Sequence, residues 1–85
     1  MPSTITAEHV RELLRSPDRD PRLVLLEGRA RVVSAEEAGT DRLRGAVEVV
    51  SRDDLAGRFG PGEPSDGDLE TVAARLEAVV AELGA

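Results

Sequence analysis

The sequence predicts a small mixed α/β domain of the α+β kind, built as a two-layer sandwich. About three strands are expected in one layer, with an N-terminal helix and a long C-terminal helix covering them. Two observations predict it: apolar residues recur at helical spacing near both ends of the chain, and short apolar runs lie between. The 85 residues fit one domain, 1–85, and the 40% of hydrophobic residues, gathered in periodic blocks, argue against disorder.

The first expected element is a helix over Ala7–Arg15. Thr6 is a typical N-cap residue, and Ile5 has the spacing to pack against Val10 as a hydrophobic staple. Ser16-Pro17 ends the helix, because the residue before a proline is disfavoured in helical conformation. A polar loop should follow.

A continuous apolar run at Leu23–Leu26 predicts the central strand of the sheet, since such runs are typical of strands buried on both faces. Glu27-Gly28 predicts a turn into a second strand, Arg29–Val33, where arginine alternates with apolar residues. Glu-Gly is a weaker turn signal than Asn-Gly, so an irregular excursion after a lone strand is the alternative. Ala46–Val50 is the third expected strand.

Capping signals predict two short helices between and after these strands. Ser34 opens a capping box before a short helical turn, and Asp41–Gly45 should then form a polar connection. Ser51 repeats the signal before a helix expected to carry Leu55 and Phe59. Residues 60–67, rich in glycine and proline, are expected to form a loop.

The longest expected helix is amphipathic, spans about four turns and is capped by Ser65. Its stripe has alternating spacings of three and four: Leu69, Val72, Leu76, Val79 and Leu83. Ala73 and Val80 widen the stripe, and three glutamates are expected on or near the solvent face: Glu70, Glu77 and Glu82. The stripe should pack on the chain's own core, but Val72, Leu76 and Val79 are also the candidate interface for a second copy.

The acidic balance of the chain bears on its partners. A formal net charge of -6 repels phosphates, and Phe59 is the single aromatic residue, so we expect no nucleic-acid binding. No stretch approaches the roughly 18 apolar residues of a membrane span, and the first residues do not resemble a signal peptide. We therefore expect no membrane association and a cytoplasmic location. The absence of cysteine excludes disulfides, thiolate metal sites and cysteine nucleophiles.

Candidate catalytic residues each have a structural interpretation. His9 is the only histidine and stands alone in a helical first turn, without a second histidine or a ligand-like motif nearby. Asp53-Asp54 and Glu36-Glu37 follow capping serines, where acids complement the helix dipole. We expect no catalytic residue, no metal and no cofactor.

Four arginines form the candidate ligand-binding set: Arg29, Arg31, Arg42 and Arg44. Alternate spacing would place each pair on one face if both segments are extended, and such a face could hold a phosphate or an acidic partner. The alternative, which we favour, is a solvated sheet face paired with Glu27 and Glu48. The glycines nearby form neither a P-loop nor a dinucleotide-binding motif.

Residues 5–59 resemble the front part of a rhodanese-like domain, a sulfur-transfer fold of parallel strands and helices. Ile5-Thr6-Ala7-Glu8 is similar to the family's opening helix, and Leu23–Arg29 to its strand ending in Asp-x-Arg. Arg44–Val49 is similar to its Pro-Gly-Ala segment entering the next strand, which the helix-starting Asp54-Leu55 follows.

This resemblance implies part of the rhodanese-like scaffold without the residues needed for sulfur transfer. Glu27 stands where the family has Asp, Arg42 stands where it usually has His, and the strand with the cysteine loop is missing. A chain without cysteine cannot carry a persulfide, so the resemblance implies a degenerate relative without sulfurtransferase activity. The predicted Glu27-Gly28 hairpin is at odds with it, because the family's strand runs parallel to its neighbours.

Two functions lead from the sequence. The first is a noncatalytic interaction module that binds an unknown protein partner or itself, through a sheet edge or the exposed part of the last helix. The second is an anion-binding or small-molecule-binding accessory domain that uses the arginine set. An exposed apolar patch favours the first, and a cavity with convergent arginines favours the second.

Overall fold

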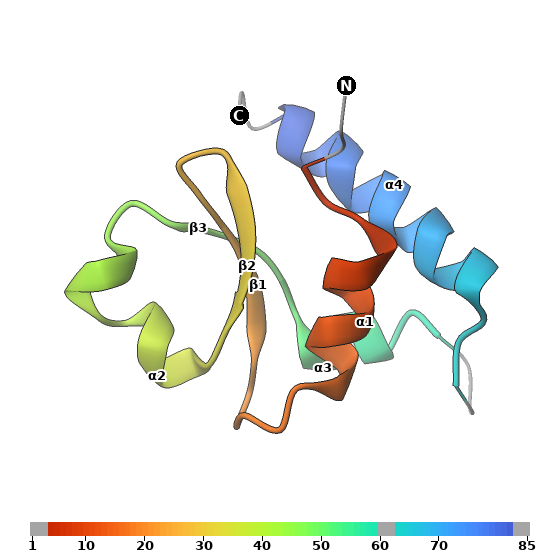
Figure 1. Cartoon of the computed structure of the whole chain (residues 1–85), viewed down its shortest axis with the longest axis horizontal. Coiled ribbons are helices and arrows are strands. Elements are labelled where there is room, and N and C mark those ends of the chain that lie inside the picture. The colour runs from red at the N-terminus through yellow and green to blue at the C-terminus, as the bar shows by residue number, and fades with distance from the viewer. Residues whose placement is uncertain (1–3, 60–62, 83–85) are drawn as a thin grey trace.

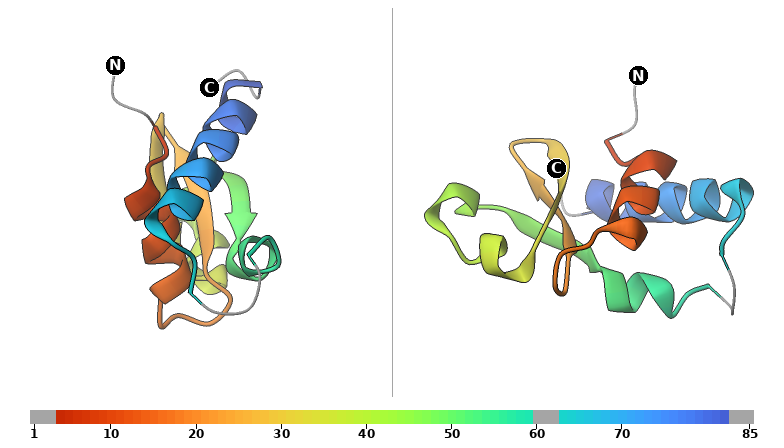
Figure 2. Two further views of the ribbon diagram at one scale, coloured as in Figure 1. Left: turned by 90° about the vertical axis from the view of Figure 1, so that its right-hand side faces the viewer. Right: turned by 60° about the horizontal axis from the view of Figure 1, so that its bottom comes forward.

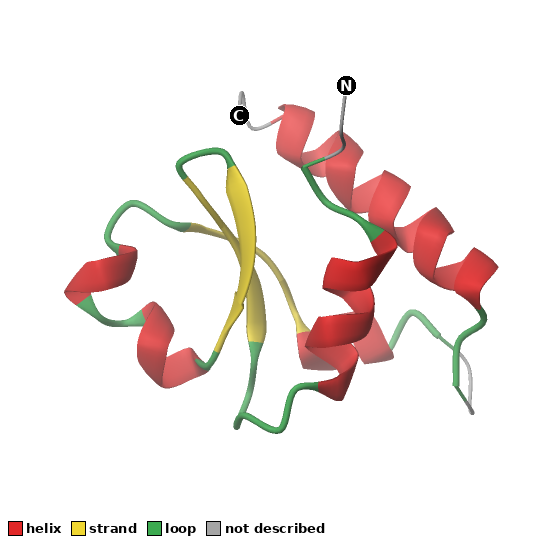
Figure 3. Ribbon diagram, viewed as in Figure 1, coloured by secondary structure: helices red, strands yellow, loops and turns green. Residues whose placement is uncertain are grey.

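The computed structural model describes residues 4–59 and 63–82. Their elements, in chain order, are α1 (Ala7–Arg15), β1 (Arg22–Leu26), β2 (Arg29–Val33), α2 (Ala35–Ala38), the 3-10 helix η1 (Asp41–Leu43), β3 (Val47–Ser51), α3 (Arg52–Ala56) and α4 (Asp66–Glu82). The mixed α+β class, with three strands, an N-terminal helix and a long C-terminal helix, is confirmed (Figures 1 and 3). Leu83 of the predicted stripe and residues 60–62 of the predicted loop lie outside the described residues.

The three strands form one antiparallel sheet in the order β2-β1-β3. The predicted central strand is therefore confirmed, and so is the hairpin, in which Val24 faces Arg31 and Leu25 faces Ala30. Between β1 and β3 the register shifts next to Leu23 and Val24. The resemblance to rhodanese-like domains implies parallel neighbours for β1, whereas both of its pairings are antiparallel.

The hairpin turn depends on two residues in left-handed conformation. Glu27 has φ 52° and Gly28 has φ 78°, the two positive values that a two-residue type I′ turn requires. Glycine accepts this conformation freely, whereas glutamate does so at a cost. The turn is therefore built on Gly28, with strain at Glu27.

Helices α1 and α4 pack on the same side of the sheet (Figures 1 and 2). Helix α1 contacts β1, β2 and α4, whereas α4 contacts α1 and β3. The larger apolar cluster lies between these helices and the sheet and includes residues of α1, β1, β3, α3 and α4: Val10, Leu13, Leu23, Leu25, Val50, Leu55, Leu69, Val72, Ala73, Leu76 and Val80. Ile5 closes this cluster at the start of the chain, as the predicted staple requires.

The opposite face of the sheet carries a smaller cluster of Val24, Val33 and Leu43. Segment 35–43 lies on this side (Figure 1). The prediction that Asp41–Gly45 is only a polar connection is wrong, because η1 forms there and leaves Leu43 only 6% exposed. A single leucine between arginines has no periodicity that would indicate its burial.

The predicted caps are present. Thr6 and His9 form a capping box at α1, whose bounds match the prediction, and Ser34 and Glu37 form another at α2. The Ser51 hydroxyl accepts a hydrogen bond from the Asp54 backbone N–H at α3. Some bounds differ from the prediction: β1 begins at Arg22, β3 spans Val47–Ser51, and α3 ends before Phe59. Helix α4 begins at Asp66, directly after its predicted cap, Ser65.

The stripe of α4 is rotated from the predicted one. Val80 is buried, whereas Val79 is 44% exposed, because the helix packs against α1 on one side and β3 on the other. Glu77 also departs from its expected place on the solvent face. Its two carboxylate oxygens accept the backbone N–H groups of Thr4 and Ile5, each at 2.9 Å. This contact ties the start of the described chain to α4.

Within residues 4–59 and 63–82, no helix is both long enough and apolar enough to cross a bilayer.

The geometry of the hairpin turn predicts opposite effects of substitutions at its two central residues. Gly28→Ala should lower the free energy of unfolding by about 1 kcal/mol, because alanine resists a positive φ. Glu27→Asn should raise it by up to about 1 kcal/mol, because asparagine tolerates that conformation. Urea denaturation followed by circular dichroism measures both.

Gly57→Ala is the matched control for these variants. Gly57 has φ -67°, and an added Cβ would meet only ordinary contacts of 3.6 Å, so no loss of stability is expected. Equal losses for Gly28→Ala and Gly57→Ala would contradict the assignment of the turn.

Candidate functional site

The structure separates the four arginines predicted to form a ligand site. Arg31 and Arg42 line one cavity of about 390 Å³ next to η1. Arg44 is exposed and lies 3.8 Å from the Asp41 carboxylate, and Arg29 lies at the hairpin outside the residues that line this cavity. The premise that both segments are extended is wrong for Arg42, which is in η1.

Positively charged, negatively charged and apolar side chains all line the cavity next to η1. Val33 and Leu43 line it together with Thr40, and Glu37 and Asp41 place carboxylates beside the two arginines. Among the described residues, neither Arg31 nor Arg42 forms an ion pair. The two guanidinium groups therefore remain able to bind an anion.

Arg22, the first residue of β1, has a structural role. It extends from β1 to Asp20 at 3.1 Å and across the sheet to Glu48 of β3 at 2.6 Å. The hydrogen bond with Asp20 and then that with Glu48 raise the pKa of Arg22 above its ordinary value. Glu48, expected opposite the candidate arginines, is thus engaged by Arg22, and the charge on β3 is neutralised.

The three predicted interface residues have different places in the fold. Val72 and Leu76 are buried in the chain's own core, which is the packing that the sequence favours. Val79 is exposed, and so is Val47 at the start of β3, at 45%. These two valines are the large hydrophobic side chains left exposed in the described chain. The exposure of Val47 could not be predicted from the sequence, because the residue pattern of a strand does not show whether that strand lies at the edge of its sheet.

Helical spacing shows which flank of α4 carries Val79. On α4, Val79 shares a flank with Val72 and Arg75, and Glu77 lies on the opposite flank, next to the N-terminal segment. Figure 2 shows α1 on one side of α4 and β3 on the other. The flank of Val79 therefore borders β3, whose outer edge carries Val47.

The acid and base candidates lie in the first turns of helices. The Nδ1 atom of His9 accepts the backbone N–H of Thr6 at 3.1 Å. Asp53 and Asp54 lie in the first turn of α3, as the capping interpretation predicts. In the part of the chain that the structure describes, no three His, Cys, Asp or Glu side chains are grouped so that they could hold a metal ion.

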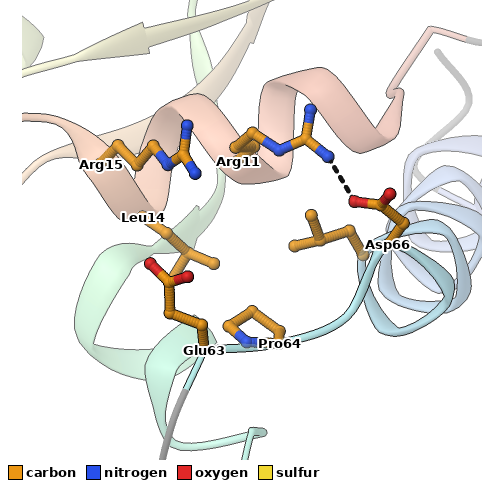
Figure 4. A pocket seen from close by; sticks show the side chains of 7 residues that line it. Arg11, Leu14, Arg15, Glu63, Pro64 and Asp66 are labelled. Carbon is orange, nitrogen blue, oxygen red and sulfur yellow. Dashed lines mark hydrogen bonds and ion pairs between the residues drawn. The ribbon is translucent and has the colours of Figure 1, made fainter.

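A cavity of about 560 Å³ lies between α1 and the beginning of α4 (Figure 4). Its lining residues are Arg11, Leu14, Arg15, Glu63, Pro64, Asp66 and Leu69. Arg11 and Arg15 are four residues apart and so share a face of α1, but this spacing alone does not predict the site. The acidic lining residues, Glu63 and Asp66, come from a segment more than 45 residues later in the sequence, which helical spacing cannot indicate.

Comparisons with protein-family models, with curated proteins and with solved structures find no match. The resemblance to rhodanese-like domains therefore stays a prediction.

The burial of the α4 stripe predicts unequal effects of two alanine substitutions. Leu76→Ala should lower the free energy of unfolding by about 2 to 5 kcal/mol, because it opens a cavity in the core. Val79→Ala should change it by no more than about 0.5 kcal/mol, because that side chain is half in solvent. Chemical denaturation at a single, low protein concentration measures both, and a comparable loss for Val79→Ala would contradict the observed rotation of the stripe.

Proposed function

We propose that this domain is a noncatalytic protein-interaction module that forms a homodimer by pairing the β3 strands of two copies. The observation that carries the proposal is the outer edge of β3, where Val47 is exposed, on a strand that α4, with its exposed Val79, also contacts. An edge strand offers unpaired backbone N–H and C=O groups, and a second strand can satisfy them.

The two edges of the sheet differ in how well they resist such pairing. Strand β2 carries exposed Arg29 and Arg31, and charged side chains on an edge strand discourage association. Strand β3 carries one charged residue, Glu48, which Arg22 of the neighbouring strand holds at 2.6 Å. The valine-rich edge of β3 is therefore the less protected of the two.

A second copy is the occupant that this edge fits best. Two identical edge strands can pair antiparallel about a two-fold axis, the commonest symmetry of protein dimers. In such a pair, the Val79 flank of each α4 borders the new strand interface. An 85-residue domain buries a modest fraction of its surface alone, so covering two exposed valines per copy adds to a small core.

The polar groups of the described chain support a noncatalytic role. The hydrogen bonds of His9 serve the α1 cap, those of Glu37 the α2 cap, and Asp68 exchanges hydrogen bonds with Ser65 at the start of α4. Groups fixed in this way have structural roles that account for their positions.

Sedimentation equilibrium over a concentration series tests the dimer. We expect a mass of two chains that falls towards one chain on dilution. Val47→Lys should weaken the association by at least about tenfold, because it places a charge in the strand interface. A mass of one chain at all concentrations up to the solubility limit would overturn the proposal.

Ala78→Lys is the matched control for Val47→Lys. Ala78 is exposed, and its position in the helical repeat places it away from the β3 side of α4. The variant adds the same charge to the same acidic chain but should leave the dimer intact. Equal weakening by both variants would contradict an interface at β3.

The net charge predicts the salt dependence of this dimer. Each copy carries a formal charge of -6, so the two copies repel, and salt screens this repulsion over a Debye length of about 10 Å at 0.1 M. Raising the salt concentration from low to physiological values should therefore strengthen the association severalfold. Weakening by salt, measured in the same sedimentation experiment, would indicate an interface held by ion pairs instead.

A second candidate function rests on the cavity shared by Arg31 and Arg42, which suits a small anion. Inorganic phosphate, titrated by heteronuclear NMR, is the probe. If the domain binds it here, Arg31→Glu with Arg42→Glu should abolish the response, whereas Arg29→Glu, outside the cavity, should leave it unchanged. Phosphate binding that survives the double substitution would exclude this function.

A further inference from the structure

The cavity between α1 and the beginning of α4 has one paired and one unpaired arginine among its described lining residues. Of its two arginines, Arg11 is already paired, since its guanidinium donates to the Asp66 carboxylate at 2.7 Å. Arg15 and Glu63 form no ion pair among the described residues. Figure 4 shows that they come from different walls, Arg15 from α1 and Glu63 from the segment before α4, and approach the same end of the cavity.

Between these charges the wall is apolar. Leu14 from α1, Pro64 from the approaching segment and Leu69 from α4 all line the cavity. Its volume of about 560 Å³ is within the range of small-molecule sites, roughly 300 to 1,000 Å³. The site thus offers one cationic group, one anionic group and an apolar surface to a single small ligand.

We propose that this cavity binds a zwitterionic small molecule with an apolar body, of the class of free aliphatic α-amino acids. The guanidinium of Arg15 binds the carboxylate, the Glu63 carboxylate binds the ammonium group, and the side chain of the ligand packs on Leu14, Pro64 and Leu69. The cavity lies at the opposite end of α4 from Val79, so this inference does not rest on the proposed dimer.

The charges of the site favour a zwitterion over a simple anion or cation. An anion would meet two carboxylates, Glu63 and Asp66, on a chain of net charge -6. A cation would meet the guanidinium of Arg15. A ligand that carries both charges satisfies Arg15 and Glu63 together and leaves the Arg11–Asp66 pair undisturbed.

The experiment titrates the isotope-labelled protein with L-leucine and follows the backbone amide resonances. We expect saturable shifts at residues of α1 and the first turn of α4, with millimolar affinity or tighter. Two comparators each lack one charge: 4-methylpentanoate has no ammonium group, and 3-methylbutylamine has no carboxylate. Each should bind at least about tenfold more weakly, because it leaves one charged side chain without its partner.

Arg15→Gln and Glu63→Gln test the two proposed contacts, and each should weaken leucine binding at least about tenfold. Both side chains are exposed, so the variants should fold, and circular dichroism checks this. Arg75→Gln, an exposed arginine on the β3 flank of α4, is the control and should leave binding unchanged.

Three results would overturn the inference. They are the absence of saturable shifts at about ten millimolar leucine, equal binding of either comparator, and unchanged affinity in the folded Arg15→Gln and Glu63→Gln variants. Failure of leucine binding with an intact dimer would overturn this site alone, and the reverse result would overturn the dimer alone.

Discussion

Burial of β1 on both of its faces is the constraint on which the rest of the structure depends. Leu23 and Leu25 belong to the larger cluster beneath α1 and α4, whereas Val24 belongs to the smaller cluster with Val33 and Leu43. Both other strands pair with β1 and not with each other. Strand β1, which is only five residues long, therefore contributes to both apolar clusters and to both strand pairings of the sheet.

Placing one strand at the centre of a three-stranded sheet leaves two open edges, which the sequence treats differently. Arginines on β2 keep a charge at one edge. The single charged residue of β3, Glu48, forms an ion pair within the chain, because Arg22 of β1 binds it. The ion pair that joins the central strand to its neighbour thus engages the single charged residue of that neighbour. In the proposed dimer, this contact would therefore affect both stability within the chain and pairing between chains.

Local signals in the sequence predicted the elements well, because caps, turns and apolar runs act over a few residues. The Thr6 cap, the Glu27-Gly28 turn and the apolar run of β1 each predicted an observed element. The misses at Leu43 and Glu77 depend on neighbours that are distant in the sequence. Leu43 is buried against Val24 and Val33 of two earlier strands, and Glu77 accepts hydrogen bonds from Thr4 and Ile5 near the other end of the chain.

The candidate sites were harder to predict for the same reason. A helical stripe shows that one face of α4 is buried, but its limits depend on α1 and β3, which decide that Val80 is buried and Val79 exposed. Likewise, Arg31 and Arg42 line the same cavity only because η1 packs against the sheet. Spacing within one element indicates a face, whereas a site requires the relative position of two elements.

Helix α4 connects the two surfaces for which we propose functions, and its anchoring indicates how they relate. Leu69 near its start lines the large cavity, and Val79 near its end borders β3; ten residues of helix separate them by about 15 Å. A ligand could influence the far end only by moving the helix as a whole. Leu76 in the core and the hydrogen bonds to Glu77 oppose such movement, because they hold the middle of α4 to the sheet and to the N-terminal segment. Binding in the cavity and pairing at β3 are therefore expected to be energetically independent.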